Sequence, residues 1–112
     1  MRERKMPIYN GCGYSLTMQV IGGKWKICII DALRNGPLRP SELFKAIPEA
    51  TERVINHQIR ELLMYKVIDR TIYAEQPPRS EYFITELGKT VFPLIDSLDD
   101  WGDKNREIYG DI

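Results

Sequence analysis

Residues 51–65 carry polar side chains of the types that hydrogen-bond to base edges and phosphates. They are Arg53, Asn56, His57 and Arg60. Separations of three, four and seven residues place them on one face of a helix, and place the apolar Ile55, Ile59 and Leu62 on another. Arginine pairs with guanine, and asparagine with adenine, through two hydrogen bonds each. The pattern is therefore typical of a helix that lies in the major groove of DNA.

The residues before this segment predict a second helix joined to it by a tight turn. Pro40 and Ser41 open a short helix with Ser41 as its N-cap, and Pro48 ends it. Thr51 then caps the following helix, which we predict over residues 51–65. Two short helices separated by so few residues form a helix-turn-helix.

A two-stranded hairpin is predicted next. Ile68–Tyr73 and Ser80–Thr85 are rich in β-branched and aromatic residues. Pro77 and Pro78 cannot donate the hydrogen bonds of a β-ladder, so they belong to the loop at the tip. We expect Arg79 to lie at this tip, against a phosphate or in the minor groove. The alternative is a surface hairpin on which the arginine is incidental.

Motifs along the chain resemble those of the HxlR family, winged-helix transcription regulators of bacteria and archaea that are related to the MarR type. The matching motifs are Gly22-Gly23-Lys24-Trp25-Lys26, Ser41-Glu42-Leu43, Arg60-Glu61-Leu62, Pro77-Pro78-Arg79-Ser80-Glu81-Tyr82 and Thr85-Glu86-Leu87-Gly88. The resemblance covers roughly residues 11–102. Several motifs in the right order are more specific than any single one.

The resemblance implies an α+β, mainly helical fold in a single domain, residues 1–112. A winged helix-turn-helix core would cover residues 14–90, and a C-terminal dimerisation helix residues 91–112. It also implies a homodimer that binds double-stranded operator DNA through the helix at 51–65 and the wing. The predicted DNA contacts are Lys24, Ser41, Thr51, Arg53, Asn56, His57, Arg60 and Arg79.

The end of the predicted DNA-reading helix departs from the family pattern. Leu63-Met64-Tyr65-Lys66 stands where the family has acidic residues followed by a glycine. Lys66 therefore occupies the place of a left-handed C-cap, a conformation that strains any residue other than glycine. We expect the departure to affect the end of this helix and not the fold.

Both ends of the chain are predicted to contact a second subunit. Tyr14–Ile21 is apolar on two sides; its periodicity alone would also fit a strand, and the resemblance makes it a helix. Pro93 should kink or restart the C-terminal helix, and an apolar stripe follows, formed by Leu94, Ile95, Leu98 and Trp101. Such a stripe could close the core, but the two-sided first helix favours a dimer interface. The predicted dimer contacts are Tyr14, Met18, Ile21, Leu94, Leu98 and Trp101.

Cys12 lies in Gly11-Cys12-Gly13, just before the first predicted helix. The helix dipole and nearby lysines would lower the pKa of its thiol and make it reactive. In several members of the family that this sequence resembles, a cysteine at this place senses oxidants or electrophiles. The alternative is that Cys12 is a small residue packed in the dimer interface. Cys28 stands in the apolar segment Trp25–Leu33, which predicts a buried helix, so we expect it to be inert packing.

The net charge is zero, but the charges are unevenly distributed. Residues 1–80 hold 13 Lys/Arg and 8 Asp/Glu, whereas residues 81–112 hold 3 and 8. A basic front suits a protein that touches phosphate with one end, although random segregation would look the same. No segment is apolar enough to span a membrane, and the charged start Met1–Lys5 lacks the apolar region of a signal peptide. Two cysteines in this setting suit a reducing cytoplasm.

The predicted function is a sequence-specific, DNA-binding transcription regulator without a cofactor or metal. An enzyme is not predicted, because no pattern of acids or cysteines around the single histidine, His57, forms a convincing triad or metal site. The alternative is a winged-helix module that binds a protein instead of DNA. The exposed face of residues 51–60 favours DNA binding over protein binding, because it lacks the aromatic anchors typical of protein interfaces.

Overall fold

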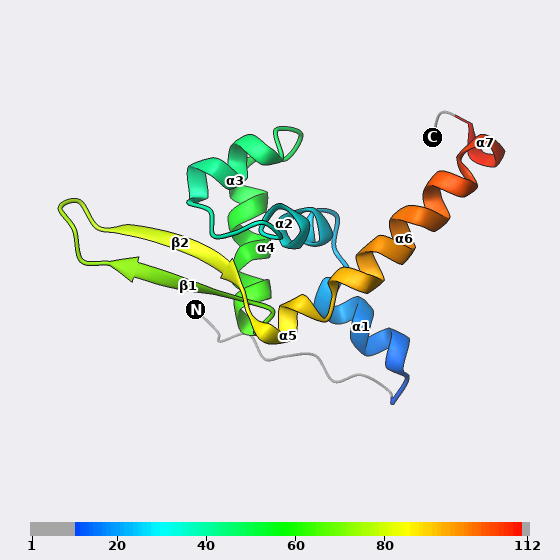
Figure 1. Ribbon diagram of the computed structural model, residues 1–112, viewed down its shortest axis with the longest axis horizontal. Coiled ribbons are helices and arrows are strands. Elements are labelled where there is room, and N and C mark those ends of the chain that lie inside the picture. The colour runs from blue at the N-terminus through cyan, green and yellow to red at the C-terminus, as the bar shows by residue number, and fades with distance from the viewer. Residues whose placement is uncertain (1–10, 111–112) are drawn as a thin grey trace.

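The computed structural model describes residues 11–110, so the charged start Met1–Lys5 lies outside them. In chain order the elements are α1 (Gly13–Ile21), α2 (Lys26–Ala32), α3 (Pro40–Ala46), α4 (Glu52–Met64), β1 (Ile68–Tyr73), β2 (Arg79–Ile84), α5 (Glu86–Lys89), α6 (Phe92–Lys104) and α7 (Arg106–Tyr109). The hairpin of β1 and β2 and the helix α6 extend in opposite directions from the bundle of α2, α3 and α4 (Figure 1). This is the predicted mainly helical α+β fold with a two-stranded wing. Within residues 11–110, no helix has the length and apolar character needed to cross a membrane.

The helix-turn-helix consists of α3 and α4. Thr51 caps α4 as predicted, because its hydroxyl oxygen accepts a hydrogen bond of 3.2 Å from the backbone N–H of Val54. The predicted N-cap of α3 was wrong: Arg39 holds that position, and its backbone N–H donates to the carboxylate of Glu42 at 2.7 Å. Pro40 takes the first helical position, where its fixed φ fits and its missing N–H is not needed. Ser41 is therefore an exposed residue of the first turn.

The core lies between α2, α3 and α4, and the side chains that α4 contributes are those its periodicity predicts. They are Ile55, Ile59 and Leu62, all fully buried. Ile21 and Ile95 also belong to this core, with only 3% and 6% of their surface accessible, because α1 packs on α4 and α6 packs on α2. This corrects their assignment to a surface for a second subunit. Both side chains fill the core of the chain itself, so neither is exposed for contact with a second copy.

The second strand of the wing begins and ends one residue earlier than predicted, at Arg79 and Ile84. β1 and β2 pair antiparallel from Ile68 opposite Ile84 to Tyr73 opposite Arg79. Arg79 is therefore the first residue of β2 and not part of the loop tip. Leu38 and Tyr82 exchange two backbone hydrogen bonds, of 3.0 and 2.8 Å, so β2 is tied to the segment just before α3.

After the wing, the chain forms the short helix α5 and then α6, and each of these helices has a defined start. Thr85 caps α5 by accepting a hydrogen bond of 3.0 Å from the backbone N–H of Gly88. Gly88 lies so close to the chain before β1 that an added Cβ would come within 2.0 Å of the carbonyl oxygen of Val67. Pro93 stands in the first turn of α6, so it restarts a helix instead of kinking one. The segment predicted as a single C-terminal helix contains both α6 and α7.

The helix α2 is less buried than its composition predicts. Ile29 and Ile30 are fully buried, but Cys28 and Asp31 on its outer side are exposed. The prediction that Cys28 is buried packing was wrong, since a short helix at the edge of a small domain keeps one side in water even when that side is apolar. Partial burial and the nearby carboxylates of Asp31 and Glu49 raise the pKa of the Cys28 thiol, which makes it less reactive.

Lys66 adopts the left-handed conformation expected for the position of the missing glycine, with φ of 66°. Replacing Lys66 with glycine is expected to raise the free energy of unfolding by about 1 kcal/mol, because glycine is unstrained there. The matched control is Lys45→Gly, in the exposed last turn of α3, where the backbone is helical. This change should lower the free energy of unfolding by about 1 kcal/mol. Urea unfolding measures both, and shifts of the same sign would contradict the strain at Lys66.

Candidate nucleic-acid interface

The outer face of α4 gathers most of the predicted DNA contacts. Arg53, Asn56, His57 and Arg60 are all exposed. An open hollow of 680 Å³ on this face is lined by Thr51, Arg53, Val54, His57 and Arg60. Asn56 is exposed on the same helix but does not line the hollow. The two arginines stand seven residues apart, about 10 Å along the helix axis, with the imidazole between them.

Arg53 and Arg60 have no acidic partner among the residues that the structure describes. His57 differs, because its Nε2 lies 3.7 Å from Oε1 of Glu61. An arginine with no partner to give up can bond to a phosphate or a guanine without breaking an existing contact. The two arginines are therefore the strongest candidates for DNA contact on this face.

A buried ion pair fixes α4 to the start of α2. Lys26 Nζ lies 3.2 Å from Oε1 of Glu61, and the lysine side chain is only 4% exposed. The ammonium also lies 5.5 Å from the ring centre of Tyr65. Beside this pair, the backbone N–H of Trp25 donates to Oε1 of Gln58 at 3.0 Å. A charge removed from water needs such partners, so α4 is held in position from its inner side.

Sequence analysis did not predict this role for Lys26, which it named only as part of the Gly22-Gly23-Lys24-Trp25-Lys26 motif. The available signal was a lysine that begins an otherwise apolar helix. The glycines before it make the close approach possible: Gly23 has φ of 133°, and a Cβ there would lie 3.3 Å from the Lys26 side chain and 3.5 Å from Gln58. The Gly-Gly-Lys-Trp-Lys motif is thus a compact turn that joins α1 and α2 and rests on α4.

Arg79 is surrounded by partners at the base of the wing loop. Its guanidinium carbon lies 4.2 Å from the ring centre of Tyr73. Its nitrogens lie 3.3 Å from Glu75 and 3.8 Å from Glu81. The Tyr73 hydroxyl donates to Glu81 at 2.9 Å, and this hydrogen bond raises the pKa of Tyr73. Arg79 would have to exchange two carboxylates for a phosphate, and it lies at the start of β2 instead of at the loop tip where it was expected.

Two other predicted DNA contacts lie exposed but apart from the hollow on α4. Lys24 is exposed, with its ammonium 5.2 Å from the ring centre of Trp25. Ser41 is exposed in the first turn of α3. Neither side chain lines the hollow, so each could at most extend the interface from its edge. Among residues 11–110, no cluster of three or more His, Cys, Asp or Glu could hold a metal.

Cys12 is half-buried at the N-cap position of α1. Burial alone would raise the pKa of its thiol, but hydrogen-bond donors on Ser15 and Tyr14 near the sulfur lower it, and the net shift is downward. The hydrogen-bond donors of the first turn of α1 therefore lower this pKa, an effect that the sequence prediction assigned in part to nearby lysines. A lower pKa increases the thiolate fraction at neutral pH, and the thiolate is the reactive form.

A winged helix-turn-helix with unpaired arginines on its exposed second helix defines a DNA-binding protein of the transcription-regulator class. Over residues 20–109 the chain matches the family described as HxlR-like helix-turn-helix, and it belongs to this family. The resemblance carried by the sequence motifs is thereby confirmed.

Relatives and solved structures agree with this membership. The chain is 43% identical over 99 residues to an uncharacterized HTH-type transcriptional regulator of Methanothermobacter thermautotrophicus, covering 88% of this chain and 72% of the relative. It is 39% identical over 113 residues to the uncharacterized HTH-type transcriptional regulator YdeP of Bacillus subtilis, covering 96% and 88%. The redox regulator HypR in its reduced form superposes with a TM-score of 0.82 at 34% identity, covering 88% of this chain and 97% of HypR.

Proposed function

We propose that two copies of this chain bind an operator with related half-sites, with α4 of each copy in the major groove. The observation that carries the proposal is a pair of arginines, without an acidic partner among residues 11–110, on the outer face of a helix whose inner face is fixed by a buried ion pair. Arg53 and Arg60 would supply charge and guanine contacts, and Asn56 and His57 would add base contacts. Such a regulator would act in the cytoplasm, where the chromosome lies.

Selection of duplexes from a random pool tests this function without knowledge of the operator. Enrichment of an inverted repeat, bound specifically in gel shifts, is the expected result. A pool from which the protein enriches no sequence would instead favour a winged-helix module that binds a protein. Val54 is the apolar residue that lines the hollow on α4, and this hollow has no aromatic anchor, which speaks against the protein-binding alternative.

The proposed surface for the second copy is built by α1, α6 and α7. Most of the large apolar side chains that remain exposed lie there: Tyr14, Leu16, Met18, Leu94, Leu98, Trp101, Ile108 and Tyr109. An apolar groove of 290 Å³ also runs between α1 and the start of α6, lined in part by Leu16, Leu87 and Leu94. So much clustered apolar surface on a small chain is typical of a subunit interface. A second copy is the occupant we propose.

We further propose that Cys12 makes DNA binding responsive to oxidants or electrophiles. Its pKa is lowered at the start of α1, and α1 carries part of the proposed dimer surface. Modification of the thiol would change the packing of α1 and so the separation of the two α4 helices. HypR, which shares this fold, is named a redox regulator, and this supports the same class of signal here.

Treatment with a quinone or diamide is expected to change operator affinity about 5- to 150-fold, the range of typical allosteric coupling. Cys12→Ser should abolish this response. Cys28→Ser is the matched control: Cys28 is exposed, so it can react, but its pKa is raised and it belongs to α2 instead of α1. Gel shifts with and without dithiothreitol measure the response. If Cys28→Ser abolishes it and Cys12→Ser does not, the sensor is assigned to the wrong thiol.

A further inference from the structure

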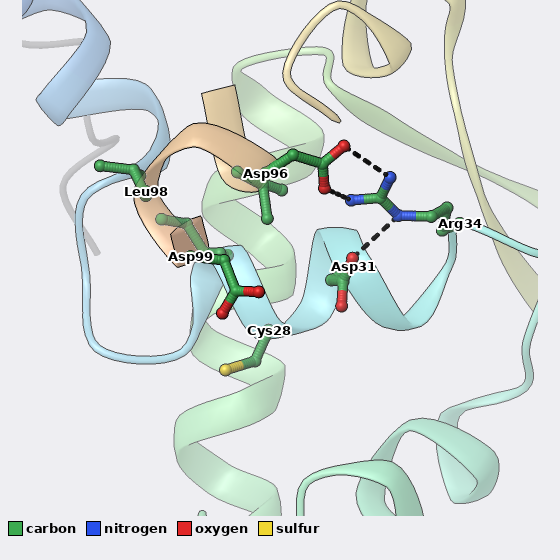
Figure 2. A pocket seen from close by; sticks show the side chains of 8 residues that line it. Cys28, Asp31, Arg34, Asp96, Leu98 and Asp99 are labelled. Atoms are coloured by element: carbon green, nitrogen blue, oxygen red, sulfur yellow. Dashed lines mark hydrogen bonds and ion pairs between the residues drawn. The ribbon is translucent and has the colours of Figure 1, made fainter. Parts of the chain in front are cut away.

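Arg34, just beyond the end of α2, connects the DNA-binding core to α6. Figure 2 shows its guanidinium between two carboxylates, with Asp96 reached from one side and Asp31 from the other. Two nitrogens donate to the two oxygens of Asp96 at 2.8 and 3.3 Å, and Nε donates to Asp31 at 2.9 Å. The guanidinium carbon lies 4.5 Å from the ring centre of Phe92. We call Arg34, Asp31, Asp96 and Phe92 the α2–α6 brace.

The brace is more constrained than an ordinary exposed ion pair. Exposed pairs usually contribute little, because two flexible side chains must be held in one geometry in water. Here the two bonds to Asp96 fix the plane of the guanidinium, and Asp31 and the Phe92 ring hold it from other directions. The hydrogen bonds to Asp96 raise the pKa of Arg34, although partial burial opposes the shift.

Few other contacts determine the direction in which α6 leaves the core. Val91 and Ile95, at the start of the helix, are buried. Figure 1 shows the rest of α6 running outward, away from the core. In the part of the chain that the structure describes, the ion pairs beyond Asp96 join α6 and α7 residues only to one another. The angle of α6 to the core therefore depends on its first turn and on the brace.

We propose that Arg34 and Asp96 are positioning residues that set the spacing between the two operator half-sites. The inference rests on the proposed function, in which Leu94, Leu98 and Trp101 of α6 contact the second subunit. If α6 joins the subunits, its angle to the core sets the distance between the two α4 helices. An operator fixes that distance at about one turn of DNA, so a looser α6 accepts more than one spacing.

The test uses the full chain and duplexes that the wild-type protein has selected from a random pool. The two half-sites are kept, and their separation is changed one base pair at a time. The wild type should prefer one separation. In Asp96→Ala, the preference for this separation over the neighbouring ones should be roughly fivefold lower than in the wild type, because one charge-assisted contact is lost in each subunit. Asp96→Glu, which keeps a carboxylate near Arg34, should retain most of the preference.

Asp100→Ala is the matched control, since it removes the same charge and an exposed ion pair, to Lys104, one turn further along α6. It should leave the spacing preference unchanged. The inference is overturned if Asp96→Ala keeps the wild-type preference, if Asp100→Ala loses it equally, or if Asp96→Ala is monomeric in sedimentation. A wild-type protein that selects no sequence at all would instead refute the proposed function. Thermal unfolding should barely change in Asp100→Ala, because its ion pair is exposed, and should change more in Asp96→Ala, which loses the constrained contact to Arg34.

Discussion

Replacing both Arg53 and Arg60 with alanine is expected to weaken specific DNA binding about 1,000-fold near physiological salt. A dimer would lose four arginine contacts, and we estimate each at about 1 kcal/mol, the lower end of the range for a base contact. If all four neutralise phosphates, the slope of log K against log salt should also become shallower by about 3.6, at about 0.9 per contact. Gel shifts or fluorescence anisotropy over a range of salt concentrations measure both quantities.

The matched control removes two cations at the far end of the chain. Lys104 and Arg106 are already paired with Asp100 and Asp103, so replacing both with alanine changes the net charge equally without touching α4. That double variant should bind DNA within a few-fold of the wild type. Equal losses in the two double variants would mean that only overall charge matters, and an unchanged affinity in the first would remove Arg53 and Arg60 from the interface.

Sequence reasoning succeeded for α4 because its structure is set by neighbours along the chain. The spacing of Ile55, Ile59 and Leu62 defines the buried face, and Thr51 can only cap the residues that follow it. The left-handed Lys66 was likewise predictable from its place after the last helical turn. Each of these features depends on contacts within a few residues, which the linear sequence displays directly.

The features that sequence reasoning missed depend on which elements meet in space. The sequence does not show that Lys26 is paired, because its partner Glu61 lies on α4 and comes within 3.2 Å of it only in the folded chain. Cys28 looked buried because its neighbours are apolar, but its side of α2 faces an open cleft beside Leu98 and Asp99 (Figure 2). Ile21 and Leu98 are both apolar, but Ile21 is buried in the core and Leu98 is exposed. Periodicity shows that a residue belongs to an apolar face, but only packing shows whether its own subunit covers that face.

Leu98→Glu is expected to convert the proposed dimer to a folded monomer. Leu98 is 56% exposed in the single chain, so a carboxylate there is hydrated in the monomer and the fold should survive. In the proposed dimer the same carboxylate would lose water without gaining a partner, at a cost of about 3–5 kcal/mol for each uncompensated charge. The dimer dissociation constant should therefore rise by more than about 100-fold, and analytical ultracentrifugation measures it.

Ile72→Glu provides the comparison, because Ile72 is 60% exposed but lies on β1 of the wing, away from α1 and α6. The same change of side chain should leave that protein dimeric. The Leu98→Glu monomer should still be helical by circular dichroism, yet bind the two-half-site duplex no more tightly than a single half-site, because nothing then links its two α4 helices. A Leu98→Glu protein with the wild-type dissociation constant would show that α6 does not join the subunits, and would leave the groove between α1 and α6 as the surface to test next.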